Sequence, residues 1–157
     1  MSESTVEYTT QEAQHILTKD FTSAAAELSA KLGDILPSVY AYVMQQNYTP
    51  GRPFTLYYKH DEENGVFEVA AGLEVAQEAQ GSGEIVANTL PGGESAVYWH
   101  IGPYDTLGES HDVLLAQVAN DGKEPCGPVR EIYVTDPGQE PDASKWKTKL
   151  VLPIKNK

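Results

Sequence analysis

The sequence predicts an α+β protein built from two βαββ repeats, and three observations support this fold class. Two stretches follow helical periodicity, and strand-like stretches flank each of them. Gly- and Pro-containing turns separate the strands. The same order of elements also occurs in both halves of the 157-residue chain. Two such repeats would combine into one antiparallel sheet that carries two main helices, with a central ligand groove along a pseudo-twofold axis.

The first repeat is expected over residues 12–80. Its predicted elements are, in chain order, a strand at 14–21, a helix at 22–43, and strands at 54–59 and 66–75. Pro37 falls inside the helical run, so the helix is either kinked there or divided into two helices. The last two strands form a hairpin, because Asn64-Gly65 is a strong short-range turn signal.

The second repeat is expected over residues 84–154. Its predicted elements are strands at 84–90 and 95–101, a helix after 105, a strand within 126–136 and a closing strand at 146–154. Asp105 is a candidate N-cap of the helix. The apolar stripe of this helix comprises Leu107, Leu114, Leu115 and Val118, with His111 beside it.

The strand within residues 126–136 carries the main candidate for a functional side chain. Alternation places Val129, Glu131 and Tyr133 on one face of this strand. A carboxylate between an apolar residue and a tyrosine on one strand face is unusual. Glu131 is either exposed to solvent, or it is buried and needs a positive partner.

The two halves can be aligned without gaps around this strand. When Pro53 is set against Pro128, Tyr58 falls opposite Tyr133 and Leu56 falls opposite Glu131. The groove would therefore be built twice from similar parts, and only the second half would contribute a carboxylate.

Composition excludes several classes of function. With 11 basic and 23 acidic residues, the net charge is −12, which argues against sequence-independent DNA binding or binding to anionic membranes and favours the approach of cations. Cys126 is the only cysteine, and the four histidines lack the spacing of a metal site, so neither metal nor cofactor is expected.

Without a signal peptide or an apolar stretch of membrane-spanning length, a cytoplasmic protein is expected. Residues 1–11 are polar and expected to be flexible.

A set of ordered motifs in the second half resembles the GyrI-like small-molecule-binding family. This family includes the effector-binding domains of AraC-type and MerR-type multidrug regulators. The motifs are Leu90-Pro91-Gly92-Gly93, Tyr98-Trp99-His100-Ile101-Gly102-Pro103-Tyr104, Gly127-Pro128, Glu131-Ile132-Tyr133 and Asp136-Pro137. The stretch from Thr49 to Tyr58 looks like their counterpart in the first half, and the resemblance spans roughly residues 12 to 154.

The resemblance implies a single SHS2-like domain over residues 1–157, with a Glu in an aromatic-lined groove that often contacts cationic lipophilic ligands. Glu131 matches the position of this carboxylate. Some stand-alone members of the family are implied to hydrolyse cyclopropane-containing compounds, and others are linked to gyrase inhibition. The chain departs from many members in one respect, because it has Leu114 to Val118 where they place a Trp late in the second helix.

Rings suited to flat cations complete the expected ligand-binding set. Tyr133 shares the strand face of Glu131 and is the first candidate, because a ring face adds a cation–π contact. Tyr58 and Trp146 come next, followed by Trp99 and Tyr104. His100 is expected to be structural, bonding near the Gly-Pro turn.

Three functions remain open on this sequence. The first is capture of amphipathic, cationic small molecules. The second is hydrolysis in the same groove, with Glu131 as the catalytic residue, and the third is interaction with gyrase. No helix-turn-helix motif is present in the sequence, so no direct binding to nucleic acid is expected.

Overall fold

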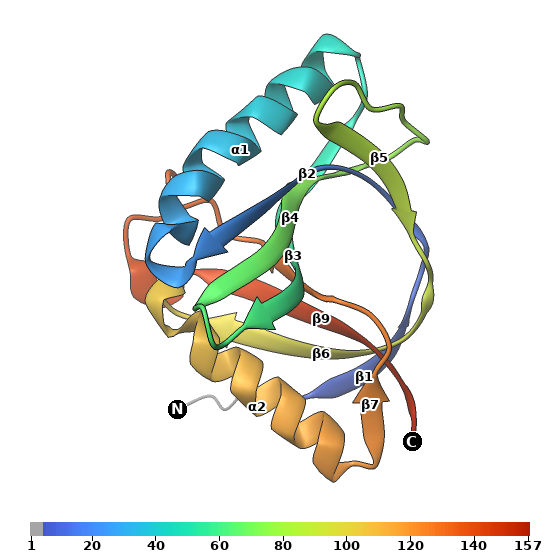
Figure 1. Ribbon diagram of the computed structural model, residues 1–157, viewed down its shortest axis with the longest axis vertical. Coiled ribbons are helices and arrows are strands. Elements are labelled where there is room, and N and C mark those ends of the chain that lie inside the picture. The colour runs from blue at the N-terminus through green and yellow to red at the C-terminus, as the bar shows by residue number, and fades with distance from the viewer. Residues whose placement is uncertain (1–4) are drawn as a thin grey trace. The chain divides into compact units, whose positions relative to one another are not determined.

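The computed structural model describes residues 5–157, which form nine β-strands and two α-helices. The elements are β1 (Glu7–Gln11), β2 (Gln14–Ala24), α1 (Ala25–Gln45), β3 (Pro50–Asp61), β4 (Val66–Val75), β5 (Ile85–Leu90), β6 (Gly93–Ile101), a 3₁₀ turn η1 (Tyr104–Thr106), α2 (Leu107–Asn120), β7 (Lys123–Pro125), β8 (Val129–Tyr133), a second 3₁₀ turn η2 (Ala143–Lys145) and β9 (Lys147–Asn156) (Figure 1). Strands pair antiparallel in both halves of the chain. The predicted α+β class, with an antiparallel arrangement and two main helices, is confirmed.

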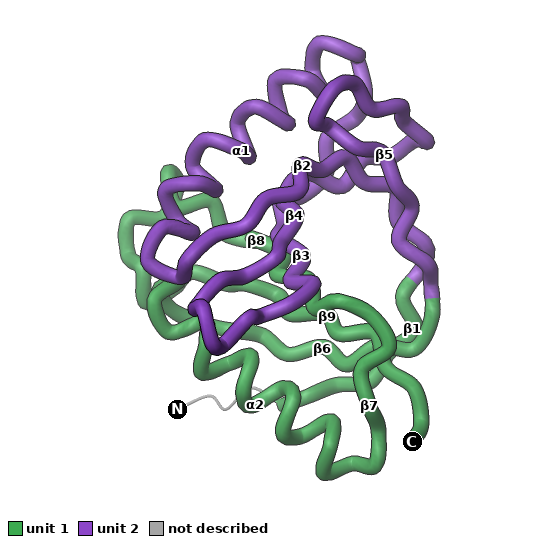
Figure 2. The backbone as a smooth tube through the Cα atoms, viewed as in Figure 1, with its two compact units in different colours: residues 1–11, 93–157 green, residues 12–92 purple. Residues whose placement is uncertain are grey.

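The chain forms two compact units (Figure 2). Unit 1 comprises the described residues up to Gln11 together with Gly93–Lys157, and unit 2 comprises Glu12–Gly92. The strand order is β3-β4-β2-β5 in unit 2 and β8-β9-β6-β1 in unit 1, where β7 also pairs with β9. Three strands have the same order in both units, β3-β4-β2 and β8-β9-β6, which supports the internal duplication inferred from the sequence.

In unit 2, α1 packs along β2 and β4 (Figure 1). Val39 and Val43, one helical turn apart, are fully buried in a cluster with Leu17, Leu73 and Val75. The helix begins at Ala25 rather than at residue 22, because β2 keeps pairing with β4 up to Ala24 and Val66. Helix α1 runs continuously through Pro37, so the division into two helices is wrong.

The β3–β4 hairpin has the predicted turn. Asn64 bonds to the Asp61 carboxylate through both its backbone N–H and its side-chain amide, and these bonds lower the pKa of Asp61. Gly65 has φ +66°, the left-handed conformation that a glycine adopts without strain.

In unit 1, α2 packs on a cluster that includes residues of β6 and β9. Leu107, Leu114 and Val118 lie in this cluster with Leu150 and Leu152. Leu115, assigned to the apolar stripe from the sequence, is instead 46% exposed. Asp105 is not the N-cap either, because it lies within η1 and α2 begins only at Leu107.

Two strands differ from the sequence-based expectation. β5, expected to open the second repeat, pairs along β2 in unit 2. β1 pairs with β6 from Glu7 to Gln11, a strand that the sequence did not predict; the flexibility expected for residues 1–11 stays a prediction, and residues 1–4 lie outside the described residues. Within the described chain, no helix is both long enough and apolar enough to cross a membrane.

Candidate functional site

Glu131 is buried. It is 2% exposed, and it is the only buried acidic residue among residues 5–157. Strand alternation puts Glu131 on the same face of β8 as Tyr133, and its neighbour on β9 is Leu150, a residue of the core beneath α2. Of the two alternatives that the sequence left open, burial with a partner is therefore correct.

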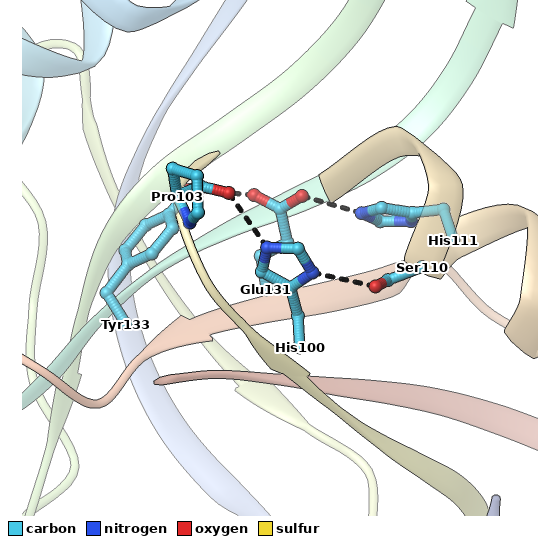
Figure 3. Close-up of polar contacts among 6 residues, drawn as sticks. All are labelled: His100, Pro103, Ser110, His111, Glu131 and Tyr133. Atoms are coloured by element: carbon cyan, nitrogen blue, oxygen red, sulfur yellow. Dashed lines mark hydrogen bonds and ion pairs between the residues drawn. The ribbon is translucent and has the colours of Figure 1, made fainter. Parts of the chain in front are cut away.

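Both oxygens of the Glu131 carboxylate are engaged, from two sides (Figure 3). The Tyr133 hydroxyl donates to Oε1 at 2.9 Å, and His111 Nε2 lies 2.6 Å from Oε2. The side chains of His111 and Glu131 are 18% and 3% exposed. A buried carboxylate needs such donors, because burial without hydrogen bonds is costly for a charge.

His111 also belongs to the site, although sequence reasoning placed it only beside the apolar stripe of the helix and not among the ligand-binding residues. It lies on α2 four residues after the buried Leu107 and three before the buried Leu114, which brings it to the helix face that packs on the strands. This spacing was visible in the sequence. A titratable side chain beside a buried helix stripe needs a polar partner, and Glu131 is the partner that α2 meets here.

Aromatic rings adjoin the carboxylate. The centroid of the Tyr104 ring lies 5.5 Å from that of Tyr133 and 5.0 Å from that of Trp146. All three rings are half-buried, and the Trp146 Nε1 donates to the Glu140 carbonyl oxygen at 2.7 Å. We call Glu131, His111, Tyr133, Tyr104 and Trp146 the Glu131 cluster. Three of the predicted ligand-binding rings thus lie in a row, and Tyr133, at one end of the row, bonds to the predicted carboxylate.

Burial raises the pKa of the Tyr104 phenol, and the negative charges of Asp136 and Glu131 raise it further. Both carboxylates are therefore close enough to Tyr104 to act on its ionisation. Negative charge at these two positions favours a cation over an anion near Tyr104.

A bend at Gly102–Pro103 fixes the position of two of these rings. Gly102 has φ +134°, and its N–H donates to the Trp146 carbonyl oxygen at 2.8 Å. His100 is 5% exposed; its Nε2 donates to the Pro103 carbonyl oxygen at 2.8 Å, and its Nδ1 lies 2.7 Å from Ser110 Oγ on α2. The predicted structural role of His100 is therefore confirmed (Figure 3).

Two predicted ligand-binding residues are not part of this cluster. Trp99 pairs with Lys149 on β9, next to the pair of Ile132 with the same lysine, so it lies on the sheet face opposite to Glu131. Its ring is 5.8 Å from the Lys149 ammonium. Tyr58 lies on β3 of unit 2 and is 52% exposed, and its role in the site stays a prediction.

The alignment of the two repeats extends from the strand to the helix at one constant offset. Leu56 and Glu131 are 75 positions apart (131 − 56), and both are 2% exposed. The same offset matches the buried helix residues Val39 with Leu114 and Val43 with Val118. It then sets Leu36 against His111. The pair His111–Glu131 of unit 1 thus corresponds to two leucines in unit 2.

No group of three or more His, Cys, Asp or Glu side chains arranged to hold a metal occurs in the described part of the chain. The chemistry that the Glu131 cluster offers is that of one carboxylate, two donors to it and adjoining rings. It can attract a cation, or it can orient and move a proton.

The chain belongs to the family described as GyrI-like small molecule binding domain, whose model matches residues 4–155. No curated protein sequence matches the chain.

Solved structures share this fold. The crystal structure of the EcmrR C-terminal domain is 21% identical, with a TM-score of 0.86, over 98% of this chain and 99% of that one. In the EcmrR–DNA complex, the chain spans 58% of the EcmrR chain. SAV2435 bound to tetraphenylphosphonium is 10% identical (TM-score 0.65; 96% and 94% covered). A hydrolase encoded by lin2189 from Listeria innocua is 14% identical (TM-score 0.63; 96% and 91% covered).

Proposed function

We propose that the protein binds amphipathic, lipophilic cations at the Glu131 cluster. The observation that carries this proposal is the position of Glu131, a carboxylate only 2% exposed that adjoins half-buried aromatic rings. A charge removed from water is screened less than one on the surface, so it attracts a bound cation more strongly. Each ring adds about 0.5–2 kcal/mol to the binding of a cation that lies over its face.

Two further observations support a cationic ligand. SAV2435, which shares the fold, is bound to the lipophilic cation tetraphenylphosphonium in its solved structure. The net charge of −12 also raises the local concentration of cations around the protein. The rings of Tyr133, Tyr104 and Trp146 would contact the apolar part of such a cation.

Substitution Glu131→Gln tests the proposal. The amide keeps the shape of the carboxylate, accepts a hydrogen bond from Tyr133 and can donate one to a neutral His111, so the melting temperature should change little. Loss of the buried charge should weaken the binding of tetraphenylphosphonium at least about tenfold, since breaking a buried charge pair typically costs about 2–5 kcal/mol. Affinity is measured by isothermal titration calorimetry.

The matched control is Glu109→Gln, which makes the same chemical change at an exposed position of α2. It should bind the cation with nearly wild-type affinity, apart from a small long-range effect of one lost charge. Equal affinities of the wild type and Glu131→Gln for tetraphenylphosphonium would contradict the proposal.

A second candidate function is hydrolysis of cyclopropane-containing compounds. It is favoured by the 2.9 Å hydrogen bond from Tyr133 to Glu131, because a carboxylate could orient or deprotonate a water while a nearby phenol stabilises developing charge. A protein of the same fold is a hydrolase. Incubation with a panel of such compounds, followed by mass spectrometry, separates the two candidates. Products that the wild type forms and Glu131→Gln does not form support the enzyme, and compounds recovered intact from the wild type support the binder.

Interaction with gyrase stays a prediction of the sequence. A supercoiling assay with purified gyrase tests it, and Glu131→Gln should leave any inhibition unchanged if the acidic surface rather than the Glu131 cluster is responsible.

A further inference from the structure

We propose that His111 is a specificity-determining residue. The His111–Glu131 pair can take up a second proton, and binding of that proton and binding of a cationic ligand exclude each other. The inference rests on the proposed function, since it concerns cation binding at the same cluster. It predicts that each cation bound displaces up to one proton, and that the affinity for cations, but not for neutral compounds of the same shape, rises with pH.

The geometry of the pair sets the number of protons. A distance of 2.6 Å between His111 Nε2 and Glu131 Oε2 requires a proton between the two atoms. With that proton alone, the pair is a neutral imidazole and a carboxylate and carries a charge of −1. A second proton makes the pair neutral, whether it resides on the imidazole ring or on the carboxyl group.

The charge of the pair decides how well a cation binds beside it. The pair with one proton offers a negative charge that is almost out of contact with water. The pair with two protons offers none, and if the second proton is on the ring, His111 itself is the cation that Glu131 holds. A ligand cation therefore selects the pair with one proton, and by linkage its binding releases the other.

Other titratable and charged groups surround α2 within unit 1. They are Glu94, Tyr98 and His100 on β6, Tyr104 and Asp105 on η1, Lys123 and Glu124 on β7, Arg130 and Tyr133 on either side of Glu131 on β8, and Glu109 and Asp112 on α2 itself. Carboxyl groups ordinarily titrate below, and phenols and ammonium groups above, the range of about pH 5–8 in which an imidazole changes charge. Within this set, His100 is the other imidazole, and its ring contacts Pro103 and Ser110.

Binding of tetraphenylphosphonium is measured between about pH 5 and 8 for the wild type and His111→Gln. Gln keeps an N–H near the position of His Nε2 but offers no ring nitrogen for the second proton, and a carboxyl group ordinarily takes up a proton only below this range of pH. We expect the wild-type affinity to rise with pH, by at most about tenfold per unit for one linked proton. We expect the affinity of His111→Gln to be nearly constant, and higher than that of the wild type at the acidic end.

Two controls separate charge from shape and from other histidines. Triphenylphosphine oxide, a neutral compound of related shape, should bind both proteins with little dependence on pH. His15→Gln changes a histidine of unit 2 whose Nδ1 bonds to Thr89, and it should keep the wild-type profile for tetraphenylphosphonium.

A second measurement needs no variant. Calorimetry of tetraphenylphosphonium binding to the wild type, in buffers that differ in their enthalpy of ionisation, counts the protons released, and we expect a value between zero and one that falls as pH rises. A wild-type affinity without pH dependence, no proton release, or a His111→Gln profile identical to the wild type would each overturn the inference while leaving the proposed function in place. Absence of binding at every pH would overturn both.

Discussion

The correspondence of His111–Glu131 with two leucines in unit 2 predicts that the polar pair can be replaced as a unit. The perturbation is the double substitution His111→Leu/Glu131→Leu, which gives unit 1 the residues that unit 2 has at positions 36 and 56. We expect the double variant to fold with wild-type stability or better, and to lose its preference for tetraphenylphosphonium over triphenylphosphine oxide.

The magnitude follows from the burial of the two side chains. His111→Leu alone leaves Glu131, 3% exposed, with one donor fewer, and a buried charge deprived of a partner costs about 3–5 kcal/mol of unfolding free energy. Glu131→Leu alone removes an acceptor from Tyr133 and from His111, which at 18% exposure keeps some access to water, at a cost of about 1–3 kcal/mol. Replacing a buried ion pair by packed apolar residues is often neutral or stabilising by about 1–4 kcal/mol.

The two substitutions should therefore be strongly non-additive. Urea denaturation of the wild type, both single variants and the double variant measures the coupling, which we expect to be about 3 kcal/mol or more in favour of the double variant. The slopes of unfolding free energy against urea should be similar in all four proteins. A double variant as unstable as His111→Leu, or less stable, would refute the view that the pair occupies an apolar site of the duplicated fold.

Two further predictions follow from the packing of unit 1. The pKa of Tyr104 is raised in the folded protein, so the stabilising contribution of its protonated phenol is complete below the ordinary pKa of 10.0 and is lost as pH rises beyond that value. The loss of unfolding free energy above pH 10 should therefore be smaller in Tyr104→Phe than in the wild type. Equal losses in the two proteins would contradict this assignment. Leu114→Ala, at a position 1% exposed, should cost about 2–5 kcal/mol in urea denaturation, whereas Leu115→Ala, at a position 46% exposed, should stay within about 0.5 kcal/mol of the wild type. Similar costs at the two leucines would contradict the orientation of α2.

The sequence was sufficient to predict those parts of the fold that depend on local turn signals and on the alternation of side chains along a strand. The β3–β4 hairpin follows from Asn64-Gly65, and the face of β8 follows from alternation alone. It was insufficient for β1 and β5, whose partners lie far along the chain. β1 is five residues long and polar, and its place beside β6 depends on a backbone ladder that carries no side-chain pattern. β5 follows a turn-rich stretch, so the sequence alone allows it to pair with strands of either half. Its pairing with β2 assigns it to unit 2.

The site shows a similar limit. Trp99 belongs to the same motif as His100 and Tyr104. Neighbouring side chains on a strand point to opposite faces of the sheet, so Trp99 lies on the face opposite to Glu131 although it adjoins His100 in the sequence. The motif identifies a family, whereas the register of β6 and β9 decides which of its aromatic residues share a face with the carboxylate.

His111 could have been found by carrying the alignment of the repeats further. The offset that aligns Leu56 with Glu131 also aligns Leu36 with His111. At both aligned positions the first half has a leucine and the second half has a titratable residue. A single polar replacement in an apolar core is destabilising, and two replacements at the same offset are tolerated only if they satisfy each other. The two exchanges therefore predict contact between His111 and Glu131 before any coordinates are considered, and the 2.6 Å distance between them agrees. On this reasoning the carboxylate and its histidine form one functional unit, and a relative that carried only one of them would need another donor or acceptor in the same place.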